Sequence, residues 1–126
     1  MNKYLDSLDH ITIITKDLAK TRDFYTKIFG MKIDENRPPF SFEGIWLSLN
    51  GRAVIHIIVK SSHKSPNIKP TLDHIAFKAK DINLIKNNLS KYDIKFIEKK
   101  TPDNKIIQVF ITDPNGIKLE LSKPID

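Results

Sequence analysis

Three histidines and one glutamate could do metal chemistry in this chain, because their positions repeat. His10 and His74 stand 64 residues apart, and the same offset separates His56 from Glu120. Imidazole and carboxylate groups bind divalent cations such as Zn, Ni, Fe, Co or Mn, and four protein ligands on an octahedral ion leave two positions for substrate or water. We therefore expect one mononuclear site formed by these four residues, if two halves of the chain pack around a pseudo-twofold axis. The fourth histidine, His63, stands in a polar segment and is expected to be solvated.

The sequence around these residues repeats with the same offset. Leu8-Asp9-His10-Ile11-Thr12-Ile13 returns as Leu72-Asp73-His74-Ile75-Ala76-Phe77, and Val54-Ile55-His56-Ile57 aligns with Lys118-Leu119-Glu120-Leu121. A repeat of this length that fills nearly the whole chain indicates two similar modules. It places His10 and His74 on the first strand of each module, and His56 and Glu120 on the last.

Each module has the element order βαβββ. In the first, Asp17 is expected to cap a helix that stops at Gly30, and Asn50-Gly51 to turn a hairpin. Its predicted strands are Leu8–Thr15, Met31–Glu35, Ser41–Leu49 and Ala53–Val59. The second module has a helix at Asp81–Lys91 and strands at Leu72–Ala79, Ile94–Glu98, Ile106–Thr112 and Ile117–Ser122. The predicted fold class is α+β in one domain, 1–126, with module 1 at about 7–60, a linker at 61–70 and module 2 at about 71–123.

Composition narrows the classes of function. The chain has no cysteine, which excludes disulfide scaffolds and thiolate metal sites. No apolar run is long enough to span a membrane and the N-terminus does not resemble a secretory signal, so we expect a cytoplasmic protein without a membrane partner. The formal net charge is +6, but only three of the 21 basic residues are Arg, and acids are interspersed among the lysines. This pattern favours a solvated surface over a nucleic-acid interface.

Strand alternation suggests which side chains face the substrate. Residues two apart on a strand share a face, which groups Phe40, Phe42, Trp46 and Ser48, and the repeat makes Trp46 equivalent to Phe110 and Ser48 to Thr112. We expect these side chains to line a cavity beside the metal and to bind substrate. The alternative is that Trp46 and Phe110 are ordinary core aromatics.

Several motifs together resemble the vicinal oxygen chelate superfamily, which contains glyoxalase I, methylmalonyl-CoA epimerase, extradiol dioxygenases, fosfomycin-resistance enzymes and bleomycin-binding proteins. The motifs are Leu8-Asp9-His10-Ile11, Asp23-Phe24-Tyr25, Phe29-Gly30-Met31, Leu72 to Phe77, Asp113-Pro114-Asn115-Gly116 and Leu119-Glu120-Leu121. The resemblance runs from about Leu8 to Ser122. It implies that the two modules form a curved mixed sheet around the metal, with ligands on the first and fourth strands at His10, His56, His74 and Glu120.

The resemblance also implies an activity. A metal-dependent lyase or isomerase of this group chelates a small oxygen-rich substrate through the divalent cation and stabilises an enediolate-like intermediate. In glyoxalase-type isomerases a metal-bound glutamate moves the proton, and here only Glu120 could be that catalytic residue. The sequence departs from glyoxalase I at His56, where that enzyme usually has Glu. Proteins of this size in the superfamily are commonly dimers, and two modules with open sheet edges favour a homodimer.

Three other activities fit the same resemblance. A fosfomycin-type thiol transferase uses two His and one Glu, but it normally extends further beyond its last strand than the six residues that follow Glu120. An extradiol-type dioxygenase needs Fe(II) and usually three ligands and four modules. A drug-binding resistance protein lacks the metal ligands, so the four ligand-type residues favour an enzyme.

Overall fold

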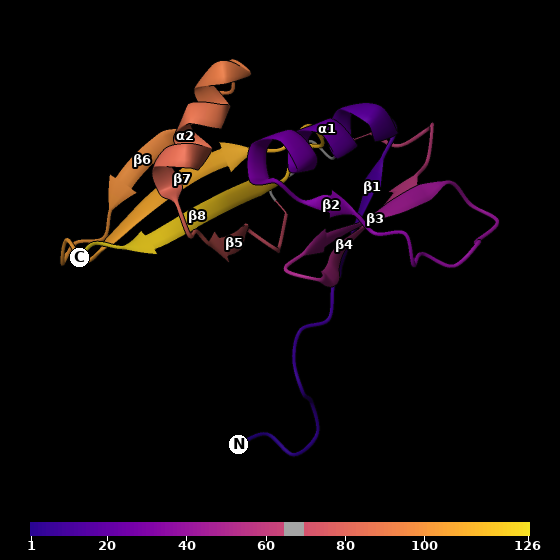
Figure 1. Ribbon diagram of the computed structural model, residues 1–126, viewed down its shortest axis with the longest axis horizontal. Helices are drawn as coiled ribbons and strands as arrows, with labels where there is room; N and C mark the ends of the chain where they lie inside the picture. Colours follow the sequence, from indigo (N-terminus) through magenta and orange to yellow (C-terminus); the bar gives the residue numbers. More distant parts are fainter. Residues whose placement is uncertain (65–69) are drawn as a thin grey trace.

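The computed structural model describes residues 1–64 and 70–126 and contains the two predicted βαβββ modules in order (Figure 1). The elements of the first module are β1 (Ile11–Thr15), α1 (Leu18–Phe29), β2 (Lys32–Ile33), β3 (Gly44–Leu49) and β4 (Arg52–Val59). Those of the second are β5 (Ile75–Lys78), α2 (Ile82–Lys91), β6 (Ile97–Lys100), β7 (Ile106–Thr112) and β8 (Lys118–Pro124).

Each module builds its own four-stranded mixed sheet. The strand orders are β1-β4-β3-β2 and β5-β8-β7-β6, so the same topology occurs twice. The first and last strands of each module pair in parallel, and the other neighbours pair antiparallel. The predicted α+β fold of two tandem modules is confirmed.

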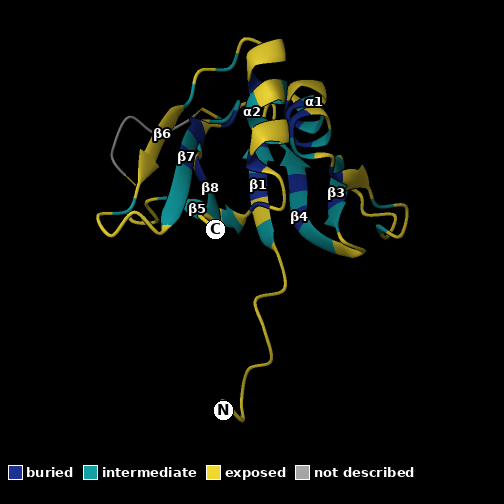
Figure 2. Cartoon of the chain, turned by 60° about the vertical axis from the view of Figure 1, so that its left-hand side comes forward, coloured by how far each residue is buried: buried dark blue, intermediate teal, exposed yellow. Residues whose placement is uncertain are grey.

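Both helices lie on the same side of the two sheets (Figures 1 and 2). The sheet residues beneath α1 are fully buried, as Leu47, Ile55 and Ile57 show with exposures of 1% or less. Alternation along β4 then directs His56, between Ile55 and Ile57, to the opposite face. Glu120 lies between buried Leu119 and Leu121 in the same way. The core under the helices therefore leaves the ligand-type residues on the other face of each sheet.

The helix boundaries follow the predicted capping residues. The Asp17 carboxylate accepts a hydrogen bond from the Lys20 N–H at 3.0 Å, and Asp81 does the same for Leu84. Helix α1 stops at Gly30, which is left-handed at φ 69° and bonds back to the Thr26 carbonyl.

Several predicted strands begin or end elsewhere. Strands β1 and β5 start three residues later than predicted, because Leu8 and Leu72 are 79% and 68% exposed and have no core to enter. His10 and His74 therefore lie one residue before their strands rather than on them. Strand β3 starts at Gly44 rather than Ser41, and β2 is reduced to two residues. The strand predicted at Ile94–Glu98 is observed as β6 at Ile97–Lys100. Ile94 is not part of it, because its N–H donates to the Leu89 carbonyl at the end of α2.

The predicted linker lies only partly within the described residues. Residues 61–64 follow β4, whereas 65–69 lie outside the described residues. His63, predicted to be solvated, is half-buried, and its N–H bonds to the Lys60 carbonyl. In the part of the chain that the structure describes, neither helix is long and apolar enough to cross a membrane.

The two modules meet where α1 packs on α2, with Asn88 donating a hydrogen bond to the Ile28 carbonyl, and at two further contacts that the repeat makes equivalent. At one, the β7–β8 turn reaches α1: the buried Tyr25 hydroxyl donates to Asp113 at 2.7 Å, and Asn115 hydrogen-bonds Thr15 and Thr21. Burial, with the Asp113 charge beside it, raises the pKa of Tyr25. At the other contact, the β3–β4 turn and α2 instead enclose a cavity of about 450 Å³, lined in part by Phe29, Gly51, Phe77, Ala79 and Ile85.

Candidate metal centre

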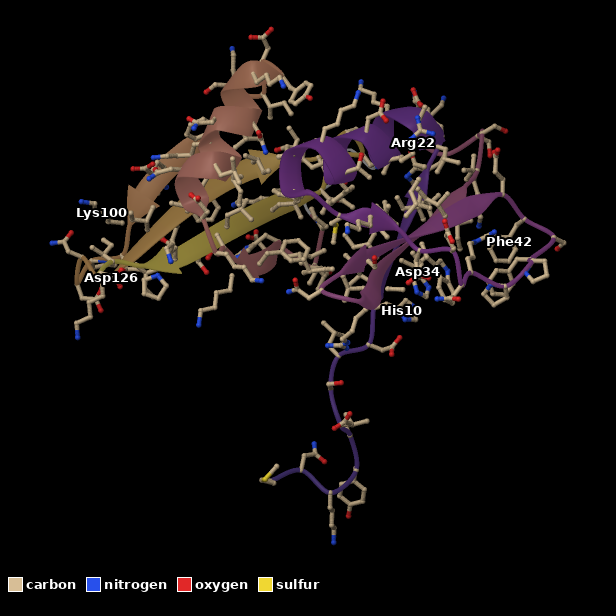
Figure 3. The ribbon with its side chains drawn as sticks, in the orientation of Figure 1. His10, Arg22, Asp34, Phe42, Lys100 and Asp126 are labelled. Atoms are coloured by element: carbon tan, nitrogen blue, oxygen red, sulfur yellow. The ribbon has the colours of Figure 1, made fainter. Side chains whose placement is uncertain are left out.

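The first module brings His10 and His56 together. Their imidazole rings stack with centroids 3.7 Å apart and planes 13° from parallel. Trp46 pairs with His56 across the β3–β4 ladder and stacks on the other side of its ring, with centroids 4.0 Å apart. Figure 3 labels His10 at the edge of the first module, at the start of β1. Two of the four predicted ligands thus lie side by side.

The second module brings together the other two. His74 Nε2 lies 3.2 Å from Glu120 Oε1, with the side chain of Glu120 only 12% exposed. Gln108 Nε2 lies 3.4 Å from the other carboxylate oxygen. A carboxylate this far from water needs donors or a cation to balance its charge. An imidazole nitrogen and a buried carboxylate oxygen 3.2 Å apart are chemically suited to share one cation.

His10 and His74, which we call the leading histidines, are each held by the aspartate that precedes them in the sequence. His10 Nδ1 lies 2.5 Å from Asp9 Oδ2, and His74 Nδ1 lies 2.8 Å from Asp73 Oδ2. A carboxylate on one ring nitrogen places the proton there and leaves the other nitrogen as a lone-pair donor. In both modules Nε2 is therefore the nitrogen available to a metal. This donor chemistry fits a divalent cation.

Sequence reasoning did not assign a role to these aspartates. The signal was present, because Leu-Asp-His occurs at both copies of the repeat with the same offset. Gln108 gave no such signal: its repeat equivalent is Gly44.

The surroundings of His56 favour its neutral imidazole form. Burial, followed by the neighbouring His10, lowers the pKa of His56. The hydrogen bond to His10 lowers the pKa of Asp9. Since a metal binds imidazole through an unprotonated nitrogen, His56 is already in the form that a ligand needs.

The structure forms two pairs and does not bring all four residues to one point. Within the described parts of one chain, no three His, Asp or Glu side chains are grouped so that they could hold a metal ion. The pairs lie on the sheet faces opposite the helices, which neither α1 nor α2 covers (Figure 2). Within the described residues of one chain, the four predicted ligands therefore stay divided into two pairs.

The predicted substrate residues fall into two groups. Trp46 and Phe110 each lie beside a ligand candidate: Phe110 contacts His74 edge to face with centroids 6.2 Å apart. The ring centroid of Phe40 lies 6.4 Å from that of Trp46. Ser48 and Thr112 lie further along their strands. A β-bulge separates Ser48 from Leu47, and Ser48 lines the cavity between the modules, whereas Thr112 lines a hollow beside α1.

Comparison with known proteins gives one family. The family model described as the Glyoxalase/Bleomycin resistance protein/Dioxygenase superfamily matches residues 7–121. Glyoxylase I 4 of Arabidopsis thaliana is 26% identical, over 94% of this chain and 71% of its own length. Metallothiol transferase FosB of Staphylococcus haemolyticus is 31% identical, over 93% of this chain and 83% of its own.

Solved structures share the fold. A glyoxylase/bleomycin resistance protein/dioxygenase domain from Frankia sp. EAN1pec superimposes with a TM-score of 0.80 at 19% identity. The match covers 97% of this chain and 94% of that one.

Proposed function

Because the chain belongs to the glyoxalase/bleomycin resistance protein/dioxygenase superfamily, we propose that it is a metal-dependent enzyme of the lyase or isomerase type acting on a small oxygen-rich substrate. The observation that carries this proposal is the pair of half-sites, His10 with His56 and His74 with Glu120. Each leading histidine has its Nδ1 fixed and its Nε2 available, as in histidines that bind metals.

The complete site is proposed to form between two copies of the chain. His10 and His56 of one copy would meet His74 and Glu120 of the other, and a twofold axis would give two such sites per homodimer. This arrangement would also cover the sheet faces that the helices leave open and so reduce their exposed apolar area. A dimer is expected to have twice the 14.5 kDa mass of the chain in light scattering.

The four residues have different proposed roles. The histidines bind the cation as neutral donors, and Glu120 both binds it and carries a proton to or from the substrate. When bound, a divalent cation supplies Lewis acidity to adjacent substrate oxygens. Gln108, 3.4 Å from Glu120 Oε2, orients that carboxylate. Phe40, Trp46 and Phe110 would contact the substrate; substrate binding by Ser48 and Thr112, and a cytoplasmic location, also remain predictions.

Elemental analysis tests the metal requirement. Protein purified without a metal-affinity tag should carry, or take up on incubation, about one equivalent of divalent metal per chain. The His10→Ala and Glu120→Ala variants should each lose it, while Asp126→Asn, at the exposed C-terminus, should keep it. Absence of stoichiometric metal from the wild-type protein, before and after incubation, would contradict the proposal.

A second candidate is a thiol transferase, favoured by the 31% identity to a metallothiol transferase. Such a transferase would join a low-molecular-weight thiol to fosfomycin. Incubation of the metal-loaded protein with both compounds distinguishes the two activities. A metal-dependent adduct would establish the transferase, and its absence beside isomerase activity would exclude it.

A further inference from the structure

The cavity between the modules lies where the equivalent contact is filled by polar side chains. At that filled contact, the Asn115 side chain reaches between β1 and α1, with hydrogen bonds to Thr15 and Thr21. Its equivalent in the first module is Gly51, where a Cβ would meet no atom within 4 Å. The residues equivalent to Thr15, Thr21 and Asp113 are apolar and line the cavity: Ala79, Ile85 and Leu49. The cavity therefore occupies the space that a polar network fills at the other contact.

Apolar side chains from both modules form most of the cavity wall. Phe29 comes from the end of α1, whereas Phe77 and Leu121 pair across β5 and β8 on the sheet face that the helices cover. Alternation along β8 places Glu120 on the opposite face. The volume of about 450 Å³ falls within the range of roughly 300–1,000 Å³ that is typical of small-molecule sites. Such walls offer water few hydrogen-bond partners, so an apolar ligand that displaces the water is stabilised.

The opening of the cavity is basic. Lys32, Lys78 and Lys80 line it and are exposed, so their charges lie at the solvent side. Among the described lining residues Asp81 is the only acid, and its carboxylate accepts the Leu84 N–H at 3.0 Å as the cap of α2. Three lysines against one aspartate give the lining a formal charge of +2. An anionic group is therefore attracted to this opening, while an apolar group is favoured further in.

We propose that this cavity binds a small amphipathic anion, an alkyl or aryl group that carries one terminal carboxylate. The apolar group lies against Phe29, Phe77 and Leu121, and the carboxylate faces the three lysines at the opening. The inference goes beyond the proposed function and does not depend on it, because this binding needs neither a metal ion nor the four ligand candidates. It assigns a role to the contact between the modules that lacks the polar network.

Calorimetric titration of the full chain with octanoate tests this proposal. Octanoate should bind at least about tenfold more tightly than butanoate, which has a shorter apolar chain, and than octylammonium, which has the opposite charge. The affinity should be the same with and without EDTA, since no metal ion takes part. In NMR spectra, octanoate should shift the amide signals of Gly51, Ala79 and Ile85 more than those of residues outside the cavity.

Two kinds of variant test the wall and the charge separately. Ile85→Trp places a larger side chain in the cavity and should weaken octanoate binding at least about tenfold. Asn87→Trp, at an exposed position of α2 outside the cavity, should leave it unchanged. The triple variant Lys32→Gln, Lys78→Gln and Lys80→Gln should weaken binding by about tenfold. Its matched control has the same change at three exposed lysines outside the cavity, of which Figure 3 labels the second: Lys95→Gln, Lys100→Gln and Lys105→Gln.

Several outcomes would overturn the inference. These are equal affinities for octanoate and butanoate, or equal effects of the two triple lysine variants. Binding that disappears with EDTA also overturns it, because the carboxylate would then bind a metal ion instead. So does a fall in the mass measured by light scattering as octanoate is added, since the cavity would then belong to a contact with a second copy. A protein without metal that still binds octanoate would contradict the proposed function alone.

Discussion

The two modules share one backbone frame but present different chemistry on the faces that carry the ligand candidates. The first has two stacked imidazoles beside Trp46, with His56 at the position where the second module has the carboxylate of Glu120. The second has His74 on the Glu120 carboxylate, with Gln108 bonded to its other oxygen and Lys118 near Phe110. The repeat thus keeps equivalent backbone positions but fills them with different side chains: the carboxylate of Glu120 lies in the second module, and the stack of His10, His56 and Trp46 lies in the first.

The contacts between the modules differ in the same way. One is closed by hydrogen bonds that the Tyr25 hydroxyl donates to Asp113 and the Thr15 hydroxyl donates to the Asn115 side-chain oxygen. At the equivalent contact, Leu49, Gly51 and Ala79 replace Asp113, Asn115 and Thr15, and the space is a cavity. The polar contact therefore adds a directional constraint that its equivalent lacks, beside the hydrogen bond that Asn88 of α2 donates to the Ile28 carbonyl of α1.

The largest difference between the two modules is expected in metal affinity, when the aspartates that hold His10 and His74 are replaced. Asp73→Asn is expected to lower metal affinity by about 10–100-fold, because His74 Nδ1 loses its carboxylate and Glu120 then competes for the ring proton. Asp9→Asn should have a smaller effect, since among residues 1–64 and 70–126 no carboxylate lies on His10 Nε2, and the side chain of Asp9 is 87% exposed. Calorimetric metal titration measures both, with exposed Asp6→Asn as control. Equal affinity in all three variants would show that the aspartates do not position the ligands.

Removal of the Tyr25 hydroxyl should weaken the polar contact between modules. Asp113 is 4% exposed and would lose one of its donors while it stays buried. Tyr25→Phe is therefore expected to reduce the free energy of unfolding by about 1–3 kcal/mol in denaturant titration. Tyr92→Phe, on a tyrosine that is 41% exposed, should change it little. Similar values for both variants would contradict a role for the polar contact.

The smallest effect is expected in the pH dependence of the metal-free protein. The folded state lowers the pKa of His56 below its ordinary 6.5, so near and below that pH the unfolded chain binds more protons than the folded one. This residue should therefore make the protein less stable as the pH falls from 7 to 5. In His56→Gln the loss of stability over this range should be smaller than in the wild type. Parallel curves for His56→Gln and the wild type would contradict the assignment.

Much of the fold was predictable because the repeat gives every element twice. Capping by Asp17 and the stop at Gly30 depend on local chemistry and were predicted correctly, whereas Asp81, predicted as the first helical residue, caps a helix that begins at Ile82. Strand boundaries were less accurate, because Leu8 and Leu72 look like strand residues until tertiary structure leaves them exposed.

The candidate ligands could be identified from the sequence, but which of them lie together in one chain could not. The offset of 64 identifies His10 with His74 and His56 with Glu120, yet the contacts that form are His10 with His56 and His74 with Glu120. These contacts follow from the parallel pairing of first and last strands within each module. The shift in the β3–β4 register between Leu47 and Ser48, which skips Val54 of β4, could not be anticipated from alternation along β3 alone.

The central claim, that each metal site combines two copies of the chain, is tested most directly with a defined heterodimer. One chain would carry His10→Ala and His56→Ala, the other His74→Ala and Glu120→Ala, co-expressed with two different affinity tags. Neither homodimer should bind metal. Since one site of the heterodimer contains all four native ligands, it should bind about one metal ion, half the wild-type content. A heterodimer without metal, beside a wild-type dimer that binds it, would contradict the account.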